Sequence, residues 1–532
     1  MRSTVETFNS DEQQALAPYF TNLDKPVFAI VNLPEVVKGA LFARYSRSAK
    51  SVRRLFLDEF LEDVERESNV APSDAGSARA EQLYTRMLSD YGDDSVAQLG
   101  GVHLACEGVS NVLTKILERG RLMAYLEQST RYVPYTDKVA DNWKYVVPQE
   151  VEDVGLAVQF REVLDDAFET YARWIPAVEA HFRRLVPKSP DDSNFVYRQS
   201  IRAKALDTLR GLLPAATRSN LGLYGTGQAY EALLIRMRAE PLAEAGEYAA
   251  LMLHELRKVI PAFLTRVDQA ERGQRWSDYL RETREETRSL ATHLLSHAES
   301  AQPEVQLTDF DPEGEEKVLA AALYAVSSLS DEELLNTVRR MTADERAALL
   351  RAYVGDRHNR RHKPGRAFER TSYRFDILAD YGAYRDLQRH RLLTTEAQRL
   401  TPHHGYDMPP AVAEVGAADD FRRVMDRSAE LFAALVNVTV PEVASYAVCM
   451  AYRIRFYMDM NAREAMHVIE LRTSPQGHPA YRRICQEMHR LIREQAGHTA
   501  IAEAMQFVDF SEVDLERLAS ERASERKRLA LS

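Results

Sequence analysis

Apolar positions recur at three- and four-residue steps along most of the chain, the spacing that places side chains on one face of an α-helix. The pattern is clearest where Leu156, Phe160 and Tyr171 follow one another. Helices are predicted on this basis at 155–187, 243–267 and 421–438, and a highly charged helix is predicted at 272–297. Long amphipathic helices are therefore expected to form most of the fold.

Strand-like patterns are fewer and shorter. Runs of β-branched and aromatic residues predict strands at 26–31, 145–147 and 453–458. The pattern as a whole predicts an α+β fold in which helices dominate.

The clearest boundary in the chain lies at residues 299–316. Acidic residues, Pro303, Pro312 and Gly314 cluster there, and the apolar periodicity lapses. A linker is predicted at this position. A chain of 532 residues is long enough for two large domains, one on each side of it.

The composition is that of a folded globular protein, with 45% apolar and 28% charged residues. A net charge of −11 argues against a nucleic-acid polymer as partner. The sequence contains neither a recognisable secretory signal nor an apolar run of membrane-spanning length, so no membrane association and a cytoplasmic location are expected. Cys106, Cys449 and Cys485 are far apart and form no CxxC pair, so inert thiols are expected. No metal is expected, because His358 and His362 lack a third ligand nearby.

Two basic segments share a pattern. Residues 119–132 and 389–399 each begin with Arg-x-Arg-Leu and follow a helical run. A single such cluster is more often a solvated helix end with charge pairs. Its recurrence in both halves favours a functional origin.

These segments resemble the RHRxxSxNExSxRY signature of the flavin-dependent thymidylate synthases. In the first half the matching residues are Arg119, Arg121, Glu127, Ser129, Arg131 and Tyr132, whereas Gly120, Ala124 and Leu126 replace family residues. In the second half the matching residues are Arg389, His390 and Arg391, and Thr394 replaces the first serine. Ala397 and Arg399 stand where the glutamate and the second serine are expected, unless a deletion brings Glu396 and Arg399 into those roles.

A second family pattern, NxRxxxHxxxxR, is complete in the second half at Asn461, Arg463, His467 and Arg472. Its first-half counterpart at 227–238 keeps only Arg238. Arg210, further upstream, resembles the family's phosphate-contacting arginine.

The resemblance implies two tandem thymidylate synthase-like units, each a small, mainly antiparallel sheet with packed helices. The predicted organisation is an N-terminal tail at 1–24, a first repeat with the nucleotide-type motif at 25–298, the acidic linker at 299–316 and a second repeat with the flavin-type motifs at 317–532.

The resemblance also implies an activity, the reductive methylation of dUMP to dTMP with FAD as cofactor and methylene tetrahydrofolate and NADPH as co-substrates. It places flavin binding at Arg389, His390, Arg391, Asn461, Arg463 and His467. It places nucleotide binding at Arg119, Arg121, Glu127, Ser129, Arg131 and Arg210, and it puts Arg472 or Arg238 at the edge of the uracil. Arginine forks suit the phosphates of both ligands.

The two halves thus keep complementary motif residues, which indicates duplication followed by division of labour. We expect the halves to pack as a pseudo-symmetric pair that brings Arg131 near His390, and two chains to form a homodimer that mimics the family's tetramer. Two alternatives stay open. One is a relative that acts on a different pyrimidine nucleotide or one-carbon donor, and the other is a non-catalytic descendant that binds nucleotide or flavin.

Overall fold

The computed structural model describes residues 6–512 except 26–27, 46–47, 49, 63, 65–97, 191 and 296–302, together with scattered positions from 515 to 526. The chain forms two compact units. The first contains the described residues of 1–109, 120–127 and 220–297, and the second contains those of 110–119, 128–219 and 298–532.

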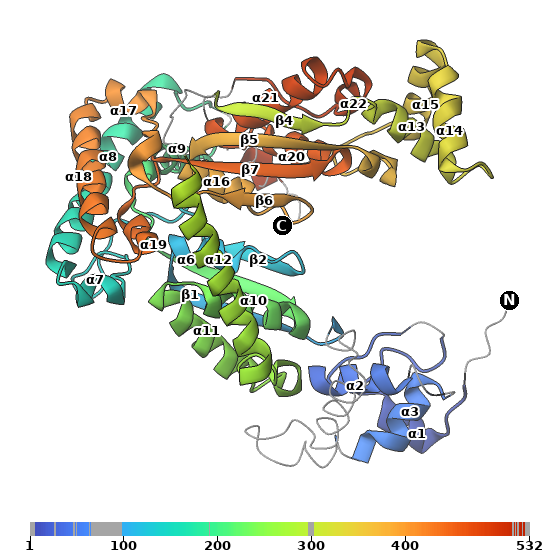
Figure 1. Ribbon diagram of the computed structural model, residues 1–532. Helices are drawn as coiled ribbons and strands as arrows, with labels where there is room; N and C mark the ends of the chain where they lie inside the picture. Colours follow the sequence, from blue (N-terminus) through green and yellow to red (C-terminus); the bar gives the residue numbers. More distant parts are fainter. Residues whose placement is uncertain are drawn as a thin grey trace. The chain divides into compact units, whose positions relative to one another are not determined.

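The first unit contains a three-stranded sheet of order β1–β3–β2, of which Figure 1 labels β1 and β2. The strands are β1 (Gly101–Ser110), β2 (Met123–Glu127) and β3 (Arg218–Thr226), and β2 pairs with β3 in antiparallel fashion. The helices are α1 (Ser10–Leu16), α2 (Glu35–Tyr45), α3 (Val52–Glu59), α10 (Gly227–Ala239), α11 (Ala243–Leu256) and α12 (Arg275–Leu294), with shorter turns at Pro261–Leu264 and Ala270–Gln274. Helix α12 confirms the predicted charged helix.

A four-stranded antiparallel sheet of order β4–β5–β7–β6 forms the core of the second unit. Its strands are β4 (Val305–Phe310), β5 (Ser372–Asp380), β6 (Thr394–Ala397) and β7 (Arg453–Asn461). Alternate residues of β7 are buried, from Ile454 to Met460, because successive side chains point to opposite faces. The predicted strand at 453–458 is confirmed.

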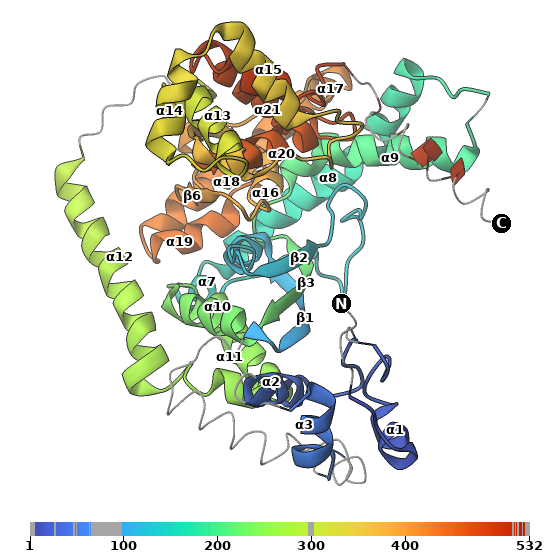
Figure 2. The ribbon, with the colours of Figure 1, turned by 90° about the vertical axis from the view of Figure 1, so that its right-hand side faces the viewer.

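Some helices of the second unit pack against this sheet, and others form a separate group. Figure 1 shows α20 and α21 beside the strands, and Figure 2 shows α13, α14 and α15 grouped together. The helices in the first part of the unit are α6 (Asn111–Leu117), α7 (Gln149–Asp153), α8 (Ala157–Leu185) and α9 (Asn194–Leu209). The later helices are α13 (Gly314–Tyr324), α14 (Asp331–Arg340), α15 (Ala343–Val354), α16 (Tyr381–Leu387), α17 (Pro410–Glu414), α18 (Ala418–Val436), α19 (Pro441–Ala444), α20 (Ala462–Arg472), α21 (Pro479–Glu494) and α22 (Thr499–Ala504). Short 3-10 helices lie at Arg210–Leu212, Arg366–Arg370, Pro402–His404 and Ser445–Ala447.

Several sequence predictions meet the structure directly. Helices α8, α11 and α18 confirm the amphipathic helices, although the second ends at Leu256 rather than near 267. The strand predicted at 145–147 is wrong, because Tyr145 makes only an isolated bridge to Thr217. Of the strand predicted at 26–31, residues 26–27 lie outside the described part, and Ile30 forms a single bridge to Phe20.

The stretch predicted as a linker contains regular structure. Strand β4 pairs with β5, where Val305 lies opposite Ile377, and α13 begins at Gly314. Val305 and Leu307 alternate with polar residues and are buried, which is the pattern of a strand with one buried face. This apolar alternation, rather than the acidic residues around it, determines the local structure. The linker prediction did not include this strand, and the boundary between the two repeats stays a prediction.

The order of elements recurs along the chain. The series β1, α6, β2, α7, α8, α9, β3, α10 is followed by β5, α16, β6, α17, α18, α19, β7, α20. Within the second unit, the segments before β3 and β7 pair in antiparallel fashion about a bridge between Pro214 and Cys449. Their backbone hydrogen bonds are exchanged symmetrically, from Ala215 N to Val448 O (2.8 Å), Met450 N to Leu213 O (2.9 Å), Ala216 N to Tyr446 O (3.0 Å) and Ala451 N to Gly211 O (3.0 Å).

Corresponding helices also pack together in the second unit. Tyr381 of α16 donates a hydrogen bond to the carbonyl of Asn111 in α6 (2.9 Å). Helices α8 and α18 are joined by Arg427, which donates to Asp166 (2.8 Å), and by Trp174, which donates to Asp420 (2.9 Å). This is the self-complementary contact pattern of a two-fold interface between like elements. Among the described helices, none is both long and apolar enough to cross a membrane.

Candidate functional site

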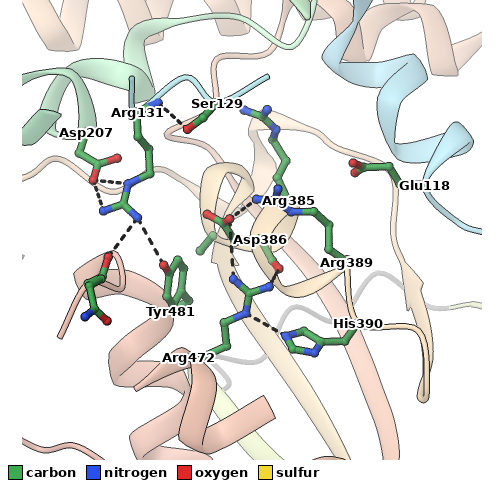
Figure 3. A network of polar contacts seen from close by, with 12 residues as sticks. Glu118, Ser129, Arg131, Asp207, Arg385, Asp386, Arg389, His390, Arg472 and Tyr481 are labelled. Atoms are coloured by element: carbon green, nitrogen blue, oxygen red, sulfur yellow. Dashed lines mark hydrogen bonds and ion pairs between the residues drawn. The ribbon is translucent and has the colours of Figure 1, made fainter. Parts of the chain in front are cut away.

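A buried polar network occupies the second unit where five segments meet (Figure 3). Its residues come from the loop after β2, the end of α9, the end of α16, the end of α20 and the beginning of α21. Most of these positions are helix ends, where the backbone turns away and side chains with charged heads can converge. The network joins residues that the sequence assigned to two different ligands.

Arg131 lies at one end of the network and is 7% exposed. Its Nε donates to Asp207 Oδ2 at 2.5 Å, and its Nη1 lies 3.4 Å from Tyr481 Oη and 3.3 Å from the carbonyl of Gln476. Burial alone would lower the pKa of Arg131, but Asp207 outweighs it and raises that pKa. The guanidinium is therefore permanently charged.

Arg210 is the second predicted phosphate ligand and is 4% exposed. Its Nη1 lies 3.7 Å from both Asp207 Oδ1 and Asp386 Oδ2, which is beyond hydrogen-bond length. Its buried Nη2 has no hydrogen-bond partner. Because an unsatisfied buried donor is costly, this nitrogen is well placed to meet an incoming acceptor.

Asp386 connects the two predicted sets of residues. Its carboxylate contacts Arg389 and lies 3.9 Å from Arg472 Nη1, on the side away from Arg210. Burial alone would raise the pKa of Asp386, but the surrounding arginines, with Arg389 first, hold it far below its usual range. The carboxylate is therefore ionised at neutral pH.

His390 is buried beside Arg472. Arg472 Nε donates to His390 Nε2 at 2.8 Å, and Arg472 Nη2 donates to the backbone carbonyl of Asp386 at 2.5 Å. Burial, reinforced by Arg472 and His467, lowers the pKa of His390 well below its usual value, so the ring is neutral. Since arginine cannot accept a hydrogen bond, the lone pair lies on Nε2 and the ring hydrogen on Nδ1.

A carboxylate on α20 lies near Nδ1 of His390. Glu464 Oε1 lies 3.6 Å from His390 Nδ1, and both side chains are 5% exposed. Donor atoms of His390, Glu464 and His467 lie within 4.8 Å of one another, a spacing found in metal sites. The donor set does not suit a metal, because Nδ1 of His390 carries the hydrogen and the other nitrogen is already engaged.

The remaining residues of the complete NxRxxxHxxxxR pattern lie on α20. Asn461 caps this helix, since its side chain accepts a hydrogen bond from Glu464 N at 2.9 Å. Arg463 Nε donates to the carbonyl of Pro364 at 2.9 Å. Burial, with Lys363 as the first electrostatic contributor, lowers the pKa of His467 to about 4. Arg463 and His467 lie one turn apart, so they place a cation and a neutral imidazole on the same face of the helix.

The other predicted residues of the second unit differ in their exposure and contacts. Arg119 is exposed and contacts Glu396. Ser129 Oγ accepts from Arg131 N at 3.3 Å. Arg389 is half-buried against Asp386, and Arg391 is exposed.

Three predicted residues belong to the first unit, and the structure does not place them in the network. Arg121 is exposed and Glu127 is buried, and Arg238 donates to Gln274. Counted from the caps Thr226 and Asn461, the counterpart of Arg472 is Met237, and Arg238 lies one position further. The pairing of Arg238 with Arg472 predicted from the sequence is therefore shifted by one residue, because it requires Gly227 rather than Thr226 at the cap position.

Gly120 stands where the family signature has histidine. A Cβ at this position would lie 2.6 Å from the hydroxyl of Tyr125, which also donates to the carbonyl of Gly120 at 2.8 Å. The place of a histidine side chain is therefore filled by a neighbouring ring.

A cavity of about 560 Å³ opens beside the network. Arg210 and Asp207 line it together with Lys204, His478 and Arg483, and its apolar wall includes Phe182, Met408, Pro410 and Met450. Pockets of this size suit small molecules.

Sequence reasoning missed the carboxylates of the site, Asp207, Asp386 and Glu464, and the phenol of Tyr481. A signal for two of them was present, since Asp207 and Asp386 each lie three residues before an arginine at a helix end. The family signature contains arginines but neither of these carboxylates.

The cysteines take no part in the network. Cys106, Cys449 and Cys485 are buried and free. Burial raises the pKa of Cys106 to about 11 and those of the other two to about 12, so none is a thiolate at neutral pH. The prediction of inert thiols is confirmed.

Fold and site together define a helix-rich α+β protein with a buried, arginine-rich site suited to an anionic ligand. The family model described as thymidylate synthase complementing protein matches residues 40–262 and 306–497. The chain belongs to this family, and the family predicted from the two short motifs is confirmed.

Relatives of nearly equal length exist. A "UPF0159 protein" of Chlamydia muridarum is 39% identical over 527 residues, which is 98% of this chain and 99% of that protein. Another "UPF0159 protein" of Thermoplasma acidophilum is 31% identical over 516 residues, or 91% of this chain and 97% of that protein. The flavin-dependent thymidylate synthase of Mycobacterium tuberculosis is 32% identical over 182 residues, or 34% of this chain and 66% of that protein.

Proposed function

We propose that this chain is a flavin-dependent thymidylate synthase that converts dUMP to dTMP, with FAD as cofactor and methylene tetrahydrofolate and NADPH as co-substrates. One observation carries the proposal. Four arginines, mostly buried, surround two ionised carboxylates, and Asp380, whose pKa burial raises to about 6, adds a third carboxylate near Arg210, so an excess of positive charge stays uncompensated. These residues are Arg131, Arg210, Arg389 and Arg472 against Asp207 and Asp386. A nucleoside monophosphate brings a phosphate of about −1.5 to −2 charge at neutral pH.

Arg131 and Arg210 are proposed to bind this phosphate. Both are at least nine-tenths buried, and Arg210 Nη2 has a donor to spare. Arginine forks hold phosphate with paired, charge-assisted hydrogen bonds. Binding there would share Arg131 and Arg210 with Asp207, so the nucleotide has to compete with an existing carboxylate.

Arg472 is proposed to contact the pyrimidine. Its guanidinium is fixed at Nε by His390 and at Nη2 by the backbone of Asp386, which leaves Nη1 3.9 Å from the nearest carboxylate oxygen of Asp386. A fixed guanidinium favours an anionic form of the uracil ring, because it offers a preorganised positive charge.

The residues around α20 fit a flavin dinucleotide. Arg360, Lys363 and Arg463 act on His467 and Glu464 with positive charge, which suits a pyrophosphate. When bound, the flavin supplies the hydride chemistry that reductive methylation needs. Arg389, His390, Arg391, Asn461, Arg463 and His467 are the residues proposed to hold it.

The division of labour is part of the proposal. The recurring element order and the symmetric backbone exchange at Pro214 and Cys449 support a tandem duplication. The proximity of Arg131 and Arg210 to Asp386, and of Asp386 to Arg472 and His390, supports one composite site within a chain. We propose that two chains form a homodimer.

Two measurements test the function. The purified protein is reconstituted with FAD, and release of tritium from C5-labelled dUMP is followed with methylene tetrahydrofolate and NADPH. Flavin absorbance with methylene tetrahydrofolate-dependent tritium release is the expected result. Flavin binding without tritium release would favour another pyrimidine or one-carbon donor, an alternative that the replacements at Gly120 and Leu126 favour. Absence of flavin binding would favour a non-catalytic nucleotide-binding protein.

A further inference from the structure

Glu464 on helix α20 is a carboxylate that none of the proposed binding roles uses. Glu464 is 5% exposed and lies one turn before His467 on the side of the helix that faces His390. Buried carboxylates are rare unless a neighbour justifies their burial. His390 Nδ1 lies 3.6 Å from Glu464 Oε1.

His390 has only one ring hydrogen, and its position matters for Arg472. With the hydrogen on Nδ1, the Nε2 lone pair accepts from Arg472 Nε at 2.8 Å. In the other tautomer, Nε2–H and Arg472 Nε–H would point at each other and repel. The tautomer of His390 therefore decides whether Arg472 is held.

We propose that Glu464 is a positioning residue for Arg472, which it holds indirectly by favouring the Nδ1–H tautomer of His390. The proposal rests on the proposed function in one respect, that Arg472 contacts the pyrimidine. The 3.6 Å separation exceeds a hydrogen bond, so Glu464 acts on the N–H electrostatically in this ligand-free state. Hydrogen bonds at active sites often shorten only when substrate binds.

The charges around Glu464 allow it to change state near neutral pH. Burial raises the pKa of Glu464 to about 7, against the opposing effects of Lys363 and Arg463. Besides these two cations, the neutral rings of His390 and His467 face it. Protonation removes the negative charge that attracts the Nδ1 hydrogen. The hold on Arg472 is therefore expected to weaken as pH falls below about 7.

The first test is spectroscopic and does not depend on activity. The protein is labelled with nitrogen-15 in its histidine rings, and His390→Gln identifies the signal of His390. At pH 8 the expected signal is that of the Nδ1–H tautomer, and in Glu464→Leu it shifts toward Nε2–H. In Glu464→Gln the amide oxygen still accepts, so the Nδ1–H signal is retained. An unchanged tautomer in Glu464→Leu would overturn the proposal.

The second test is kinetic. Glu464→Leu is expected to lower kcat for tritium release about tenfold, within the range of roughly 10- to 100-fold for residues that orient a functional ligand, with KM for dUMP changed less than about twofold. Glu464→Gln should restore most of the rate and remove the loss of rate that the wild type shows below pH 7. Glu494→Gln, at an exposed carboxylate paired with Arg490, is the control and should leave both constants unchanged.

The outcomes separate the two proposals. If no variant and no wild-type protein releases tritium, the proposed function fails, and the nitrogen-15 signals still decide the role of Glu464. The positioning role is wrong if the wild type is active and Glu464→Leu raises KM instead of lowering kcat. It is also wrong if Glu464→Gln loses as much activity as Glu464→Leu.

Discussion

The two Arg-x-Arg segments begin alike and are surrounded differently. Each follows a short helix, α6 or α16, and leads into an edge strand, β2 or β6. In the second segment the middle residue is His390, a buried neutral imidazole that accepts from Arg472. In the first it is Gly120, and the hydroxyl of Tyr125 lies where a side chain would begin.

The same contrast extends beyond the segments. Met237, which is fully buried, corresponds to Arg472. Ser445 corresponds to Arg210, because each is the first residue of the 3-10 helix before β7 or β3, and it donates to the carbonyl of Leu400 at 2.9 Å. In the proposed tandem, lost polar residues have thus been replaced by groups that pack or bond locally. We infer that the eroded positions of both copies were filled in this way and that the composite site of the second unit is the one that works.

The largest difference is expected between substitutions of Arg472 and of its counterpart Met237. Arg472→Ala should lower the rate of tritium release about a hundredfold or more, the cost of losing a preorganised charge at the reacting group. Met237→Ala should instead destabilise the fold by about 2–5 kcal/mol, because it leaves a cavity in the core. Chemical denaturation alongside the assay distinguishes the two. An equal loss of rate in folded Met237→Ala would show that the first copy also works.

A second prediction restores the missing histidine. Gly120→His should cost about 1–3 kcal/mol of stability, because the new side chain overlaps Tyr125. It should not raise the flavin content, which is expected to be one FAD per chain in both proteins. Absorbance of released flavin against protein concentration provides the measurement. Two flavins per chain, in either protein, would contradict a single composite site.

The smallest effects are expected at the eroded positions. Arg119 is exposed and paired with a half-exposed Glu396, so Arg119→Ala should change stability by less than about 1 kcal/mol. Neither flavin content nor nucleotide affinity should change, and the same holds for Arg399→Ala. A tenfold loss of nucleotide affinity in Arg119→Ala would show that this motif position is still in use.

Much of the fold and part of the site follow from the sequence alone. Long amphipathic helices such as α8 and α18 were predictable because their apolar stripes are long, whereas β4 was hidden by the acidic residues around Val305 and Leu307. The arginines were predictable because they form part of a signature. Asp207 and Asp386 were not, since a carboxylate at a helix end is common and only the folded chain shows that each meets arginines from distant segments.

The tautomer of a histidine and the capping role of a side chain cannot be predicted from the sequence either. The motif predicts Asn461 as a ligand residue, but its side chain also caps α20. Nothing in the sequence indicates that His390 accepts from Arg472, because that contact joins positions far apart in the chain.

The division of labour between the copies is tested most directly by paired titrations of FAD and dUMP on Arg131→Ala and Arg463→Ala. Losing a charge-assisted hydrogen bond costs about 1.5–3 kcal/mol, or roughly ten- to a hundredfold in affinity. Arg131→Ala should weaken dUMP by this factor and keep its flavin, and Arg463→Ala should do the reverse. Arg131→Lys, which keeps a charge beside Asp207, is the control for folding. If Arg131→Ala loses its flavin while Arg463→Ala keeps it, the account is contradicted.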